Sequence, residues 1–289
     1  MVMDTAFVKG LSRTETRRIV GKFYDLGSPY YLQVWGEHIH DGYFVTGKET
    51  RQEAQINLVD LLASQSNIQM GQCVLDVGCG VGGSSVRLAK VFGAETLGIT
   101  ISPRQAMIAK ARAAEEGAFS SFALMDAEQM GLTRSRGIFD VVWAVAVMTH
   151  LHDQNAFVEA AIELLNDGGR FVMFDWMLAE NTNGIGDSLV TAVSEGMLLS
   201  SLHRMSEYTR WLDRLGLQTT FSEDMTQRTI KTWDLAISTL TDPDVWKIAI
   251  KTSAEERREL LRFLKVIVPM KRAMEQGKLI SGAIVARKP

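Results

Sequence analysis

The stretch VLDVGCGVGG at residues 74–83 decides the fold class of this chain. Its apolar start is typical of a buried strand, and its glycines form a turn, because glycine adopts backbone angles that other residues avoid. The segment SSVRLAKVF at residues 84–92 then has helical spacing. A strand, a glycine-rich turn and a helix in this order put backbone amides and a helix N-terminus beside a ligand. We therefore expect residues 76–83 to line a binding site.

Strands and helices alternate along the chain after this stretch. We predict strands at residues 73–77, 95–100, 119–126, 139–145 and 169–177, and helices at residues 84–92, 104–116 and 155–166. Helices of about a dozen residues between strands form βαβ units, which build a parallel sheet with right-handed crossovers. The core is therefore an α/β domain, and its ligand is expected beyond the carboxyl ends of the strands.

The segments on either side of this core are predicted to be mostly helical. Residues 1–70 form an N-terminal helical segment in which an aromatic loop follows a helix at 16–26 and precedes one at 48–64. Residues 71–289 form the ligand-binding core, with a helical lid inserted at about 180–215 and 228–276. Within these insertions we expect one helical stretch at 186–215 and helix breaks near Pro243 and Pro269. Further strands are predicted at 217–224 and 278–288.

Composition limits the class of protein. The chain has 289 residues, a net charge of −3 and 46% hydrophobic residues, which is typical of a folded soluble protein without a nucleic-acid partner. We find no signal peptide and no apolar run long enough to span a membrane, so we expect a cytoplasmic protein. Cys73 and Cys79 are too close for a disulfide framework and lack neighbours at metal-ligand spacing, so no metal site is expected. The 14 Met residues fit either a bulky apolar ligand or a Met-rich core.

The residues around the glycines indicate which ligand binds. Gly78, Gly80 and Gly83 spell the dinucleotide pattern G-x-G-x-x-G, but the second strand ends in Thr100 where a dinucleotide site usually has an acid. Asp76 also puts a negative charge where a pyrophosphate would lie. An acid at this position suits a ligand that carries ammonium and sulfonium groups instead.

The pattern D-x-G-x-G resembles motif I of the class I S-adenosylmethionine-dependent methyltransferases. Residues 139–153 resemble the fourth-strand motif of that family, and LLNDGGRFVMFD at 164–175 resembles its segment before the fifth strand. More narrowly, residues 30–44, GITISPRQ at 98–105 and the closing GAIVARKP resemble the γ-tocopherol methyltransferase-like group, which methylates small natural products. The resemblance implies a Rossmann-like, seven-stranded sheet of order 3-2-1-4-5-7-6 with an antiparallel C-terminal strand, and S-adenosyl-L-methionine as cofactor.

The resemblance also implies which residues hold the cofactor. Asp76 contacts its amino acid end, Thr100 and its neighbours bracket the ribose and adenine, and Asp126 reads the adenine amino group. Gln105 fits equally well as a solvated helix residue. The predicted cofactor-binding set is Asp76, Gly78, Cys79, Gly80, Thr100, Ile101, Gln105, Asp126, Ala127 and Ala144.

Three residues are candidates for the chemistry. His150 follows the fourth strand, where the group often has acids, and is ranked first as a base for an acceptor that carries a proton. Asp175 ends the fifth strand and would orient an acceptor or stabilise a positive charge. Tyr31 represents the aromatic loop, whose rings either face the sulfonium or pack on the sheet.

We therefore predict methyl transfer to a bulky apolar small molecule, at C, N or O. C-methylation of a prenyl alkene coupled to carbocation cyclisation is a second hypothesis. A nicotinamide-dependent oxidoreductase and a partner protein that binds S-adenosylmethionine without catalysis are two more. Homo-oligomer formation through the N-terminal helix stays open.

Overall fold

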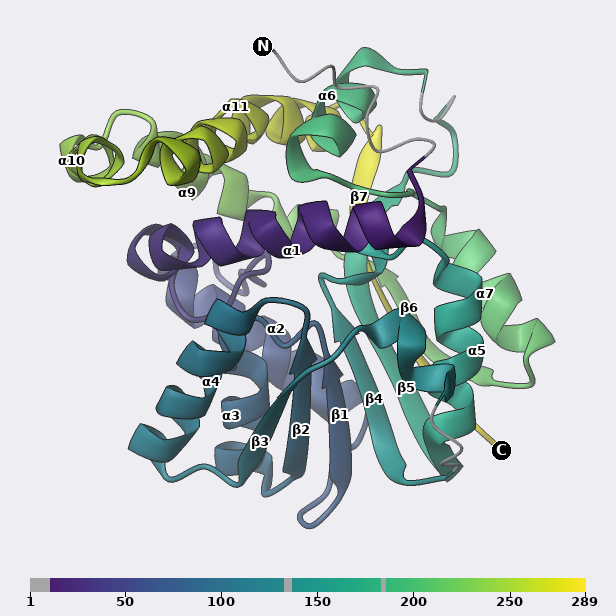
Figure 1. Cartoon of the computed structure of the whole chain (residues 1–289). Coiled ribbons are helices and arrows are strands. Elements are labelled where there is room, and N and C mark those ends of the chain that lie inside the picture. The colour runs from purple at the N-terminus through teal and green to yellow at the C-terminus, as the bar shows by residue number, and fades with distance from the viewer. Residues whose placement is uncertain (1–10, 133–136, 183–185) are drawn as a thin grey trace.

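The computed structural model describes residues 11–132, 137–182 and 186–289. Within this part of the chain, one sheet has the strand order β3-β2-β1-β4-β5-β7-β6, which confirms the predicted order (Figure 1). Its strands are β1 (Cys73–Val77), β2 (Glu95–Thr100), β3 (Ser120–Leu124), β4 (Phe139–Val145), β5 (Leu165–Leu178), β6 (Gln218–Asp224) and β7 (Leu279–Arg287). The first five pair in parallel, and β7 is antiparallel to both β5 and β6, as expected of the C-terminal strand.

Helices cover both faces of the sheet, because its central strands are apolar on both sides. In β4, Val141 and Trp143 pack on the face of α2, whereas Val142 and Ala144 pack on the face of α5. This alternation follows from the two-residue period of a strand. The first face carries α2 (Arg51–Gln65), α3 (Gly83–Phe92) and α4 (Pro103–Glu116), and the second carries η3 (Ala127–Leu132), α5 (Gln154–Leu164) and α7 (Met205–Arg214).

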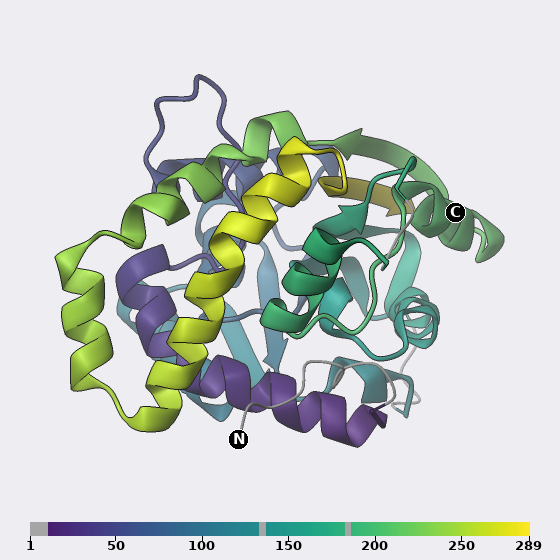
Figure 2. The same cartoon turned by 90° about the horizontal axis from the view of Figure 1, so that it is seen from above.

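A third group of helices lies over the carboxyl edge of the parallel strands, as Figure 2 shows from above. These helices share an apolar cluster of their own, to which α1 contributes Phe23, α6 contributes Met197 and α11 contributes Phe263 and Met270. The group consists of α1 (Arg13–Tyr30), α6 (Ser188–Met197), α9 (Lys231–Thr239), α10 (Pro243–Lys251) and α11 (Ala254–Glu275), with the single turn α8 (Thr226–Thr229) leading into α9. It corresponds to the expected lid, but it includes the N-terminal helix, so we call it the roof.

Polar contacts fix α1 to the core. Asp25 accepts hydrogen bonds from the hydroxyl of Ser102 and from the backbone N–H of Arg104, at the start of α4. At the other end of the helix, Arg17 Nε lies 3.7 Å from Asp126 Oδ2. The N-terminal helix α1 is therefore held against the carboxyl edge of the parallel strands.

Three local predictions were wrong. The stretch 186–215 is not one helix, because Leu198 has φ 57° and α7 begins only at Met205. Pro269 does not break α11, since the helix buries Ile267 and Met270 around it, and this burial offsets the missing backbone hydrogen bond. The aromatic loop is helical at first, because α1 runs to Tyr30 and continues as the π-helical turn η2 (Tyr31–Trp35).

No helix in the described ranges is both long and apolar enough to cross a membrane. The division of the chain into a segment at 1–70 and a core at 71–289 stays a prediction.

Candidate active site

The glycine loop after β1 is shaped by backbone angles and by close packing. Gly78 and Gly80 have φ of 68° and 55°, in the left-handed region that favours glycine. A Cβ on Gly78 would lie 2.5 Å from Cγ2 of Val147, so this glycine is required for packing. A Cβ on Gly80 would meet only Cδ1 of Ile39, at 3.8 Å, and would otherwise point into open space. The loop therefore leaves room for a ligand at Gly80.

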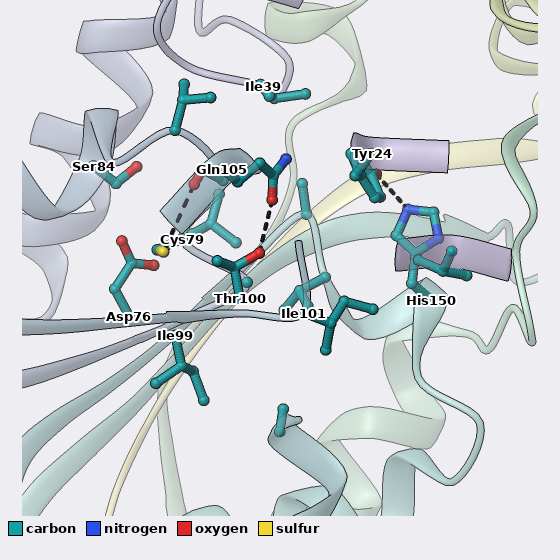
Figure 3. A pocket seen from close by; sticks show the side chains of 18 of the residues that line it. Tyr24, Ile39, Asp76, Cys79, Ser84, Ile99, Thr100, Ile101, Gln105 and His150 are labelled. Carbon is teal, nitrogen blue, oxygen red and sulfur yellow. Dashed lines mark hydrogen bonds between the residues drawn. The ribbon is translucent and has the colours of Figure 1, made fainter. Parts of the chain in front are cut away.

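This space belongs to a cavity of about 990 Å³, its open mouth included, at the carboxyl edge of β1, β2 and β4 (Figure 3). We call it the first cavity. Ala144 does not reach it, because its side chain is buried inside β4, and Val145, Ala146 and Val147 line the cavity instead. The other nine predicted cofactor residues all line it: Asp76, Gly78, Cys79, Gly80, Thr100, Ile101, Gln105, Asp126 and Ala127.

Asp76 is a buried carboxyl group in this cavity, only 3% exposed. Ser85 Oγ donates a hydrogen bond to its Oδ2 at 2.5 Å. Burial raises the pKa of Asp76 to about 7, and the hydrogen bonds from Ser85 oppose this rise only in part. A carboxylate without a basic partner is costly to bury, so the site favours a ligand that brings a positive charge.

Thr100 and Gln105 form a buried pair across the start of α4. Thr100 Oγ1 donates to Gln105 Oε1 at 2.8 Å, and the backbone N–H of Ser102 donates to Thr100 Oγ1 at 3.2 Å. Gln105 is 4% exposed, so the interpretation as a solvated helix residue is wrong.

Asp126 closes the cavity on the β3 side. Its Oδ1 accepts a hydrogen bond from the backbone N–H of Glu128 at 3.0 Å, and its Oδ2 accepts one from Gln129 Nε2 at 3.2 Å. These contacts and the nearby Arg17 of α1 fix the carboxylate at the cavity rim.

A second cavity, of about 510 Å³ with its open mouth included, lies beneath the roof next to the first. Five side chains line both cavities: Tyr24, Ile39, His40, Ala146 and His150. We call these five residues the shared wall.

The buried His150 pairs with the half-buried Tyr24 in the shared wall. Its Nε2 lies 2.7 Å from the Tyr24 hydroxyl, and its Nδ1 lies 3.4 Å from the Leu198 carbonyl oxygen. Burial lowers the pKa of His150 to about 4, so the ring is neutral at pH 7. The contacts fit a proton on Nδ1, with Nε2 accepting from Tyr24.

Asp175 and Tyr31, the other two candidates for the chemistry, line the second cavity and not the first. Asp175 accepts hydrogen bonds from the N–H and hydroxyl of Thr149, at 3.2 and 3.0 Å, and from the N–H of Trp176 at 2.8 Å. Burial raises its pKa to about 6. The Tyr31 hydroxyl is buried without a hydrogen-bond partner.

Two site residues on α1, Arg17 and Val20, were not predicted. They line the first cavity together with Tyr24. Their spacing puts them on one helix face, which the sequence shows, but nothing in the spacing indicates that this face covers the site. Among the described residues, no group of three or more His, Cys, Asp or Glu side chains is placed to hold a metal ion.

Known proteins share this architecture. The family described as mycolic acid cyclopropane synthetase matches residues 11–234. The 27-O-demethylrifamycin SV methyltransferase of Amycolatopsis mediterranei (strain S699) is 28% identical over 270 residues, which cover 93% of this chain and 97% of that protein. The chloroplastic tocopherol O-methyltransferase of Arabidopsis thaliana is 30% identical over 186 residues, which cover 60% of this chain and 53% of that protein.

A solved structure agrees in fold. Mycolic acid cyclopropane synthase CmaA1, complexed with SAH and CTAB, has a TM-score of 0.82 at 19% identity, over 94% of this chain and 98% of that one. The family match, the sheet order and the glycine loop with Asp76 point the same way. This chain belongs to the mycolic acid cyclopropane synthetase family, and it is a class I methyltransferase that uses S-adenosyl-L-methionine to methylate small molecules.

Proposed function

We propose that the first cavity binds S-adenosyl-L-methionine, that the second binds a bulky apolar acceptor, and that the methyl group passes at the shared wall. The observation that carries this proposal is the pair of adjoining cavities with five side chains in common. The cofactor, when bound, supplies a methyl group on a positively charged sulfur, and this charge already makes the methyl carbon an electrophile. The protein then has to align the acceptor and exclude water.

The residues of the first cavity fit the cofactor. The open space at Gly80 allows close approach to the loop, and the buried carboxylate of Asp76 supplies the charge that an ammonium group needs. Asp126 offers a carboxylate at the cavity rim for the adenine amino group. Thr100 and Gln105 hold each other in place between these two acids.

His150 is proposed as the base for an acceptor that loses a proton. Its neutral ring has one nitrogen that accepts, and Tyr24 donates to that nitrogen before the acceptor arrives. The acceptor proton reaches Nε2 either directly, with the Tyr24 hydroxyl displaced, or through that hydroxyl, which passes its own proton on. Asp175 holds Thr149 beside His150 and so positions the turn η4 (Met148–His150). Tyr31 would shape the acceptor cavity.

Membership of a methyltransferase family sets aside the nicotinamide oxidoreductase and the partner protein without catalysis. C-methylation followed by cyclisation stays a second hypothesis, and a cytoplasmic location and self-association stay predictions.

The test has two parts. Calorimetry should show saturable binding of S-adenosylhomocysteine and none of NAD. Turnover with radiolabelled S-adenosylmethionine is then measured on panels of apolar phenols, amines and prenylated alkenes, and on a panel of small polar acceptors. Met197→Trp, which fills the second cavity at a residue that does not line the first, should abolish acceptor turnover and leave cofactor binding intact. Cofactor binding without turnover of any apolar acceptor, alongside turnover of small polar ones, would contradict the acceptor class.

A further inference from the structure

The second cavity contains a buried acid that methyl transfer does not explain. Asp41 is 1% exposed and lines this cavity but not the first. Its Oδ2 accepts hydrogen bonds from Trp176 Nε1 at 3.0 Å and from Ser281 Oγ at 3.1 Å. Its Oδ1 has no hydrogen-bond partner, and no Lys, Arg or His of the described chain forms an ion pair with it.

An unpaired buried carboxylate destabilises the folded protein, and a positively charged ligand can relieve this destabilisation. Burial raises the pKa of Asp41 to about 6, against the hydrogen bonds from Trp176 and Ser281 and the nearby indole N–H of Trp233, which all lower it. At neutral pH the group is still largely ionised, and a buried ion is stable only when it is paired. A cation entering the cavity would supply both the charge and a donor for Oδ1.

The rest of the lining suits a cation as well. Six aromatic side chains follow one another around the cavity, with neighbouring ring centroids 5.2–6.4 Å apart, and we call them the aromatic wall. The wall consists of Tyr24, Tyr31, Phe263, Trp35, Trp233 and Trp176. Aromatic faces attract positive charge most strongly where water is excluded.

The charges of the residues that line the second cavity exclude an acceptor with an anionic group. Asp175 is a second buried carboxyl group in the same cavity, and among the described residues that line it none is Lys or Arg. Burial lowers the pKa of His40 and His150, which also line the cavity, to about 4, so both rings are neutral at pH 7. A carboxylate or a diphosphate on the acceptor would therefore meet two acids and no positively charged side chain.

We propose that the second cavity binds its acceptor through a positively charged nitrogen, which the Asp41 carboxylate and the aromatic wall hold together. The acceptor class is thus a hydrophobic amine or ammonium compound. This inference rests on the proposed function only in taking the second cavity as the acceptor site, and it concerns the nitrogen that anchors the acceptor, whichever atom receives the methyl group.

A series of three probes of the same shape tests the charge. Phenethylamine, 2-phenylethanol and phenylacetate carry a cation, a neutral group and an anion on one scaffold. Each is titrated into the protein by calorimetry at about pH 7.5, with and without saturating S-adenosylhomocysteine. The amine should bind at least about tenfold more tightly than the alcohol, the usual scale of a charge-assisted hydrogen bond, and phenylacetate should bind most weakly.

Asp41→Asn keeps an oxygen for Trp176 and Ser281, removes the charge and replaces the other oxygen with an NH₂ donor. It should weaken phenethylamine binding about tenfold and change 2-phenylethanol binding by less than about twofold. Asp244→Asn, which removes an exposed acid on α10, is the matched control and should change neither.

Two results would overturn the inference. In one, the alcohol binds the wild-type protein as tightly as the amine. In the other, Asp41→Asn weakens both probes equally, which is the result of a purely structural role. If the variant does not fold, the order of the three probes on the wild-type protein still decides. Failure of S-adenosylhomocysteine to bind would instead count against the proposed function, because the probes are also titrated without it.

Discussion

Asp76→Asn should make the protein more stable and its cofactor binding weaker. Burial raises the pKa of Asp76 from 3.8 to about 7 in the folded protein. Below about pH 4 the carboxyl group is protonated in both the folded and the unfolded chain and does not reduce stability. Between about pH 4 and 7 the unfolded chain releases the proton and the folded chain keeps it, so the free energy of unfolding falls as pH rises. The destabilisation is complete above about pH 7, where the substitution should relieve it.

The size of the effect follows from the same shift. At about 1.4 kcal/mol per pH unit, the interval between 3.8 and about 7 corresponds to roughly 4 kcal/mol as an upper bound. We expect a gain of about 1–4 kcal/mol in the free energy of unfolding at about pH 8, shrinking toward zero near pH 4. Because the asparagine lacks the charge that the cofactor's ammonium group needs, its affinity should fall at least about tenfold.

Urea unfolding followed by circular dichroism, at about pH 4.5 and 8, measures the first quantity, and calorimetry with S-adenosylhomocysteine measures the second. Asparagine can still accept the hydrogen bond from Ser85, so packing is preserved. Ser85→Ala is the opposite control: it removes a donor that favours the charged form and should destabilise at pH 8. An Asp76→Asn protein that is less stable than the wild type at pH 8, or whose gain is the same at both pH values, would refute the reasoning.

Further predictions concern the loop and the base. Gly80→Ala should weaken S-adenosylhomocysteine binding at least about tenfold, at a cost of about 1–2 kcal/mol in stability for its positive φ, as calorimetry and urea unfolding would show. Gly78→Ala should destabilise by about 1–3 kcal/mol more, because its Cβ meets Val147; equal stabilities would contradict this packing argument. His150→Ala should lower turnover about 10²-fold and barely change cofactor affinity. Since burial lowers the pKa of His150 to about 4, the pH–rate profile of the wild type should show no histidine ionisation between about pH 5.5 and 8. An ionisation in that range that disappears in His150→Ala would contradict the lowered pKa.

The sheet was predictable because its strands are short apolar runs between strong turn residues. The predicted strands at 73–77 and 95–100 match β1 and β2 to the residue. The strand order came from the resemblance, since periodicity alone does not order strands. The cofactor residues could be named for the same local reason, because most of them lie within a few residues of a strand end.

The acceptor side was less predictable, because it is built from contacts between distant segments. Tyr24 meets His150 across 126 residues, and Asp41 meets Ser281 across 240 residues. No local pattern encodes such pairs. The break predicted at Pro269 was wrong for a related reason, since tertiary burial of α11 outweighs the local preference of proline.

The π-helical turn η2 makes the shape of the acceptor cavity depend on chain length. A π turn holds one residue more than an α turn over nearly the same rise, and each α-helical residue turns the chain by about 100°. Removing one residue at the exposed Gln33 would therefore restore α-helical winding with Trp35 still beside Trp233 and Phe263, its neighbours in the aromatic wall. Adding one residue more would instead rotate Trp35 by about 100° away from both of them. Single-residue insertions in this turn, and not only substitutions, are therefore a route by which related chains can exchange one acceptor for another.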